Sequence, residues 1–123
     1  MYGYSLDGFV GMMIWLNKYW CCRQRFGYEL EKTDLSGANL RKADLRDTYL
    51  GGSNLSGANL RNAYLSEADL ENADLQEASL QGANLEGTHL EGANLERAMY
   101  NSDTIWPEGF NPQERGAHDE AED

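Results

Sequence analysis

The most regular feature of the chain is a leucine at every fifth position through its middle section. Two residues before nearly every one of these leucines the side chain is small, and the two residues after it are mostly polar or glycine. Between the small residue and the leucine the sequence usually has Asp or Asn. The fourteen leucines follow one another without a gap: Leu30, Leu35, Leu40, Leu45, Leu50, Leu55, Leu60, Leu65, Leu70, Leu75, Leu80, Leu85, Leu90 and Leu95.

A period of five fits neither regular secondary structure. Five residues advance an α-helix by about 140°, which would scatter the leucines around all of its sides. Five is also an odd number, so successive leucines of a straight strand would alternate between its two faces. The leucines can share one interior only if the chain turns once per repeat. Glycines two residues after a leucine, such as Gly37 and Gly82, suit these turns because glycine tolerates φ > 0.

The segments SGANLRKADL, SEADLENADL and EGANLERA resemble the A-[DN]-L-x-x pattern of the pentapeptide-repeat family. The resemblance covers residues 28 to about 105. It implies an all-β fold, a right-handed quadrilateral β-helix with four repeats per square coil and about four coils. Leu and the small residue would then point inward. The string TIWPEGFNP is similar to the ending of many cyanobacterial members of the family.

A coil of twenty residues predicts which side chains stack on one another. Leu35, Leu55, Leu75 and Leu95 should form one interior column, and Leu30, Leu50, Leu70 and Leu90 another. The third column should contain Leu40, Leu60, Leu80 and Tyr100, and the fourth Leu45, Leu65, Leu85 and Ile105.

The repeats divide the chain into three parts. Residues 28–107 are the predicted solenoid, and Tyr100, Ile105, Trp106 and Phe110 are expected to form an aromatic cap over its last coil. Residues 108–123 are acidic and lack large apolar side chains beyond Phe110, so we expect a disordered tail. Residues 1–27 are predicted to be a helical cap or docking segment.

Residues 8–25 read as one N-terminal α-helix that begins after Asp7. Its stripe of Phe9, Met13, Leu16 and Trp20 could close the first coil. Ile14, Trp15 and Tyr19 lie off that stripe. Because a helix that is apolar nearly all round usually has a second neighbour, these three side chains are the candidate partner-docking residues.

The formal net charge of −11 argues against an ordinary nucleic-acid binder, which needs a basic field. The charge is uneven, with +2 over residues 1–65, −7 over 66–98 and −6 over 99–123. Cys21 and Cys22 are adjacent and cannot supply a disulfide framework, which favours a reducing compartment. With no secretory signal and no apolar run long enough to span a bilayer, the expected location is the cytoplasm, either free or peripheral to a membrane.

Candidate chemistry is sparse. Two neighbouring thiols without a nearby His make a poor metal site, so Cys21 and Cys22 are interpreted as small apolar residues. His89 should stack one coil from Asp69, which we interpret as a solvated pair, and His118 lies in the acidic tail. The Asp/Asn positions invite calcium but have no calcium-loop motif. We therefore predict no catalytic, metal or cofactor residues and no enzyme.

The expected function is a non-enzymatic scaffold or protein-interaction module, a small accessory subunit that docks on a larger and sometimes membrane-associated assembly. One alternative is a DNA-mimicking inhibitor of a type II topoisomerase, because the quinolone-resistance members of the family resemble duplex DNA in width and charge. The basic side chains Arg41, Lys42, Arg46 and Arg61 argue against it. Another alternative is attachment to a membrane surface through the N-terminal helix. The partner and the oligomeric state are left open.

Overall fold

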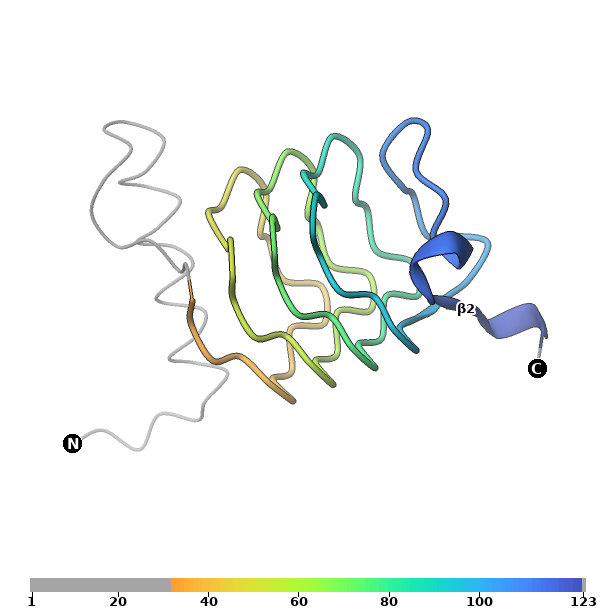
Figure 1. Cartoon of the computed structure of the whole chain (residues 1–123), viewed down its shortest axis with the longest axis horizontal. Coiled ribbons are helices and arrows are strands. Elements are labelled where there is room, and N and C mark those ends of the chain that lie inside the picture. Colours follow the sequence, from red (N-terminus) through yellow and green to blue (C-terminus); the bar gives the residue numbers. More distant parts are fainter. Residues whose placement is uncertain (1–31, 123) are drawn as a thin grey trace.

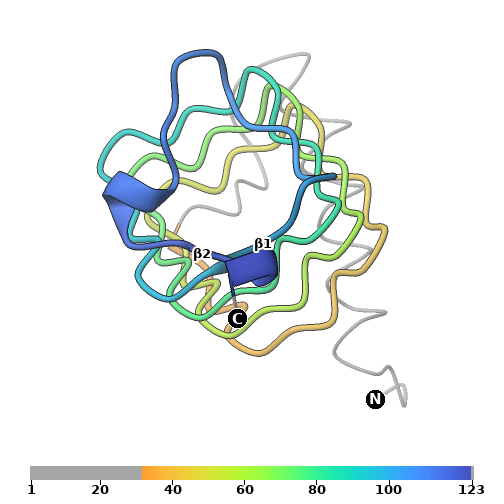
Figure 2. The same cartoon turned by 90° about the vertical axis from the view of Figure 1, so that its right-hand side faces the viewer.

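The computed structural model describes residues 32–122, which wind into a tube of stacked coils (Figure 1). Each coil pairs with the next in parallel, and the partners are twenty residues apart for most of the chain. Asp34 pairs with Asn54, Asn54 with Asp74, and Asp74 with Asn94. This register confirms four five-residue repeats per coil. Figure 2 looks along the tube and shows the coils superimposed around one interior.

The sides of the coils are single β-bridges rather than long strands, because the chain turns again after every few residues. At each bridge the backbone forms hydrogen bonds to the coil before it and to the coil after it. The N–H of Asn54 donates to the carbonyl of Thr33 at 2.9 Å, and the N–H of Leu55 donates to the carbonyl of Asp74 at 2.7 Å. The tube is therefore held by backbone hydrogen bonds that run along its axis.

Four short named elements lie at the C-terminal end. Strand β1, Met99–Tyr100, pairs in parallel with β2, His118–Asp119. The 3₁₀ helix η1 spans Gln113–Arg115 and η2 spans Glu120–Glu122. The described part of the chain contains no α-helix.

The interior is filled by the leucines and by the small residues two positions before them. Leu45 to Leu85 are fully buried at every fifth position, and Leu90 and Leu95 are nearly so. Burial of each leucine side chain contributes on the order of 1.5–3 kcal/mol. Thr88 and Thr104 fill small positions and donate their hydroxyls to the carbonyls of Leu65 and Leu80, which satisfies the buried oxygens.

Every regular corner uses the same β-turn. The N–H of the small residue donates to the carbonyl of the preceding leucine, as from Ala38 to Leu35 at 3.0 Å. The residue two positions after each leucine has φ near +60° to +70°, whether it is Gly57 or Glu67. A positive φ at the third turn position together with this hydrogen bond is typical of a type II turn. Glycine is favoured there, but the fold also accepts Lys, Asp, Asn, Glu and Arg.

The Asp or Asn before each leucine supports the corner that follows. Its side-chain oxygen accepts the backbone N–H two residues later, as Asn84 does from Glu86 at 3.0 Å. The carboxylate of Asp34 accepts from both the hydroxyl and the N–H of Ser36, and these bonds hold the pKa of that carboxyl below its ordinary value. The same bond recurs at Asn39, Asp44, Asn54, Asn59, Asp69, Asp74 and Asn94.

The prediction that Ile105 joins the interior column of Leu85 is wrong. Ile105 pairs with Asn84 instead, so the register there is twenty-one residues, and its side chain is 49% exposed. The corner after Tyr100 contains one additional residue, which moves Thr104 into the buried small position. At other corners the N–H of this turn residue donates to a backbone carbonyl of the next coil, as from Gly57 to Gln76. Here the N–H of Gly82 donates to the side-chain amide oxygen of Asn101 at 3.1 Å instead.

The acidic tail is not the disordered segment expected from its composition. The N–H of His118 donates to the carbonyl of Ala98 at 2.7 Å, and the carbonyl of Gly116 accepts from Arg97 at 2.9 Å. The tail thus adds one more paired segment to the last coil. In it Ala117 is buried, as the small residue of each repeat is. The open edge of the last coil offers unpaired backbone groups, and the tail pairs with them regardless of its own polarity.

Three aromatic side chains gather at the same end of the tube. The rings of Tyr100 and Trp106 meet edge to face at 5.4 Å, and Trp106 stacks on Phe110 at 5.3 Å. Trp106 and Phe110 are partly buried against the leucine core, and Tyr100 is buried.

Candidate functional site

The docking residues predicted from the sequence, Ile14, Trp15 and Tyr19, lie outside residues 32–122, as do the predicted N-terminal helix and Cys21 and Cys22. Within the part of the chain that the structure describes, no helix is long and apolar enough to cross a membrane. Within residues 32–122 the candidate binding surfaces are the outer sides of the coils.

One side of the tube carries both large apolar side chains that are exposed among residues 32–122. We call it the Tyr64 face, defined by the rung residues Asp44, Tyr64, Asn84 and Ile105. Tyr64 is 51% exposed and Ile105 is 49% exposed. They are two coils apart, and at ~4.8 Å per coil their backbones are separated by roughly 10 Å. Because aromatic side chains are enriched in protein interfaces, this flat side is a candidate protein contact.

Basic side chains border the N-terminal half of the Tyr64 face. Arg46 lies two residues after Asp44, and its Nε donates to the Asp44 carboxylate at 2.8 Å. Arg61 lies at the preceding corner and donates to the Gln81 amide oxygen at 3.3 Å. Arg41 and Lys42 occupy the same corner one coil earlier. The Tyr64 face therefore combines apolar anchors with a local positive charge that contrasts with the acidic molecule.

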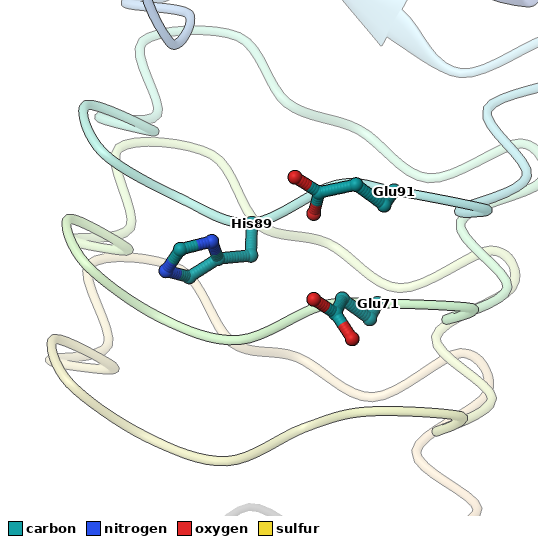
Figure 3. A group of neighbouring side chains, drawn as sticks. All are labelled: Glu71, His89 and Glu91. Carbon is teal, nitrogen blue, oxygen red and sulfur yellow. The ribbon is translucent and has the colours of Figure 1, made fainter.

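A second side carries a cluster of charged groups. We call it the His89 face, defined by the rung residues Tyr49, Asp69 and His89 with the corners on either side. The predicted stacking of His89 on Asp69 is confirmed by their β-bridge. Figure 3 shows Glu71 on one coil and His89 and Glu91 on the next, with the two carboxylates one above the other beside the imidazole. One possible ligand atom from each of these residues lies within 4.8 Å of the other two.

The His89 face is hollowed beside this cluster. The depression has a volume of about 370 Å³ and is lined by Asp47, Thr48, Tyr49, Glu67, Asp69, Glu71 and His89. Four of these side chains are carboxylates, so the depression favours cations. The sequence contained a signal for the cluster, because Glu71 and Glu91 are one coil apart. The predicted partner of His89 was Asp69 alone, and the glutamates at the neighbouring corner were missed.

These features define a class of protein: a leucine-lined, four-sided β-solenoid of five-residue repeats with flat outer faces. The family model described as pentapeptide repeats matches the chain in overlapping segments, residues 29–57, 43–82, 53–92 and 78–99. The chain belongs to the pentapeptide-repeat family, whose fold is of the protein-interaction type. Membership implies a right-handed β-helix.

Similar solved structures include two pentapeptide repeat proteins. A pentapeptide repeat protein of the Arabidopsis thaliana thylakoid lumen is 30% identical with a TM-score of 0.58, and the match covers 72% of this chain and 59% of that one. A pentapeptide repeat protein from Nostoc PCC 7120 is 32% identical, with coverage of 90% and 95% and a TM-score of 0.45. No curated protein sequence matches the chain significantly.

Proposed function

We propose that this protein is a non-enzymatic scaffold, a small accessory subunit that docks on a larger protein assembly. The observation that carries the proposal is the Tyr64 face, where Tyr64 and Ile105 are exposed on one ladder. Backbone bonds between coils fix both positions, so binding a partner would order few additional groups. The family's interaction-type fold supports the same reading.

The charge around the Tyr64 face indicates the kind of partner. Arg41, Lys42, Arg46 and Arg61 would favour a partner surface with carboxylates around an apolar centre. We propose the cytoplasm as the location, with Ile14, Trp15 and Tyr19 as a second contact region. Attachment to lipid through the N-terminal segment is the alternative, and flotation with protein-free liposomes distinguishes it from binding to a protein.

Size-exclusion chromatography of native cell extracts tests the proposal. The parent protein should elute with an assembly much larger than its 13.8 kDa monomer. The variant Tyr64→Ser/Ile105→Ser should shift toward the monomer with little change in melting temperature, because both side chains are about half exposed. A matched variant on another face, Glu71→Gln/Glu91→Gln, should stay in the assembly.

Two further results decide between the contact regions. If Trp15→Ser/Tyr19→Ser releases the protein while Tyr64→Ser/Ile105→Ser does not, the N-terminal segment is the docking region and the Tyr64 face is not. If the parent protein elutes as a free monomer from its own cells, the scaffold proposal is wrong.

A further inference from the structure

Some of the stacked charges on this solenoid are balanced by a neighbouring coil. The Arg97 guanidinium lies 3.1 Å from the Glu77 carboxylate one coil away, and the rung of Asp34, Asn54 and Asp74 alternates charged and neutral side chains. Like charges directly opposite each other on neighbouring strands are destabilising. At Glu71 and Glu91, as at Asp47 and Glu67, two carboxylates occupy the same corner position on successive coils.

Glu71 and Glu91 form no ion pair among residues 32–122. Among residues 32–122, the ion pairs are those of Arg46 with Asp44 and Arg97 with Glu77. The side chains of Glu71, His89 and Glu91 make no hydrogen bond or ion pair within that range, although the backbone N–H of Glu71 donates to the Asp69 carboxylate at 3.0 Å. The neighbouring carboxylates of Glu67 and Asp69 add to the negative potential.

The backbones that carry the three side chains are fixed by the ladder. The carbonyl of His89 accepts from Leu70 at 2.8 Å, and that of Glu91 accepts from Asn72 at 2.9 Å. A tetrahedral ion with bonds of ~2.0 Å needs ligand atoms about 3.3 Å apart. Because all three side chains are exposed, small rotations can close the present spacing of up to 4.8 Å without moving the backbone.

We propose that Glu71, His89 and Glu91 bind one divalent transition-metal ion of the zinc type. One imidazole nitrogen with two carboxylates is a donor set that Zn²⁺ accepts, whereas Ca²⁺ and Mg²⁺ prefer oxygen ligands alone. Water would complete the coordination on the solvent side. The ion would neutralise the stacked glutamates, and the acidic hollow would attract it. The proposal is independent of docking through the Tyr64 face.

Isothermal titration calorimetry with ZnCl₂ tests the site on the full chain. The parent for this experiment carries Cys21→Ser/Cys22→Ser, so that thiolates cannot bind the metal. We expect one Zn²⁺ per chain, with MgCl₂ and CaCl₂ binding at least tenfold more weakly. His89→Ala and Glu71→Gln/Glu91→Gln should each weaken Zn²⁺ binding at least tenfold. Zinc should also shift the imidazole NMR signals of His89 at one equivalent.

Two control variants make the result specific. His118→Ala removes the other histidine, and Glu86→Gln/Glu96→Gln removes two glutamates outside the cluster; both should bind Zn²⁺ like the parent. The proposal is overturned if His89→Ala binds as tightly as the parent, if Mg²⁺ binds as tightly as Zn²⁺, or if the parent shows no stoichiometric binding. Circular dichroism of each variant establishes that it is folded before titration.

Discussion

The Asp or Asn before a leucine stabilises the corner that follows and does not pack in the core. Asn84 and Asp74 place a side-chain oxygen against the backbone N–H two residues later, which satisfies a donor that the tight turn leaves out of the ladder. Asp and Asn are the side chains with the right length for this bond. The preference for these residues in the repeat therefore has a local cause, and it does not indicate a calcium site.

The stability of the folded chain should depend on the ionisation of Tyr100 at high pH. Tyr100 takes the place of a leucine in its column, and burial raises the pKa of its phenol above the ordinary 10.0, helped by the negative charges of Asp119 and Glu122. The unfolded chain then ionises at lower pH than the folded one. Stability contributed by the neutral phenol is complete below about pH 10 and is lost as pH rises through the higher folded pKa.

The measurement is chemical denaturation of the parent and Tyr100→Phe between pH 8 and 11. Below pH 10 the difference in free energy of unfolding between the two proteins should be constant. Above pH 10 the parent should lose stability more steeply than Tyr100→Phe. Equal slopes for the two proteins above pH 10 would mean that Tyr100 is not buried by the tail.

At the scale of elements, the C-terminal tail completes the solenoid. The carbonyl of Ala73 accepts the backbone N–H of Asn94 on the next coil. Ala93 lies on the last coil at that side, and among residues 32–122 no backbone N–H donates to its carbonyl. The guanidinium of Arg115 replaces that donor, donating to the carbonyls of Ala93 at 3.1 Å and Leu90 at 3.2 Å. Arg115 also lies over the ring of Phe110 at 5.3 Å. The short η1 helix thus places a cation on the open end of the tube.

Arg115→Ala should lower the free energy of unfolding by about 1–3 kcal/mol, because charged hydrogen bonds to two carbonyls are lost. Urea denaturation of the purified protein measures the change. Arg46→Ala is the matched control, since its ion pair with Asp44 is half-exposed and such surface pairs contribute little to stability. If both variants lose the same small amount, Arg115 does not cap the last coil.

At the scale of the whole molecule, charge is sorted both along the tube and around it. The cations Arg41, Lys42 and Arg46 lie on the first described coil, while all acidic groups lining the depression except Asp47 lie on later coils. A DNA mimic needs a long negative track, because duplex DNA has one charge per ~1.7 Å of axis. Carboxylates that recur once per coil, ~4.8 Å apart, beside a basic corner make a poor imitation.

We therefore expect the purified protein not to inhibit gyrase supercoiling at low micromolar concentration. The assay should be repeated at several salt concentrations, because electrostatic inhibition weakens with ionic strength. The variant with Glu71, Glu86 and Glu91 all changed to Gln is the comparison. Strong, salt-sensitive inhibition by the parent that this variant lacks would favour the DNA-mimic function over the scaffold.

The sequence by itself determined the solenoid, its interior and its register. A leucine at every fifth residue excludes a helix and a flat sheet, and the family resemblance supplied the twenty-residue coil that the bridge from Asp34 to Asn54 confirms. Periodicity carries this information because each repeat makes the same contacts with its neighbours. The stacking of His89 on Asp69 followed from the same counting.

Only the tertiary structure decided what happens where the repeat is broken. One additional residue after Tyr100 exposes Ile105, and a polar tail supplies the last rung through Ala117 and the end cap through Arg115. Neither outcome follows from composition, because backbone pairing at an open edge depends on which groups are unpaired there and not on side-chain polarity. The clustering of Glu71, His89 and Glu91 likewise depends on how a corner and a face lie side by side in three dimensions.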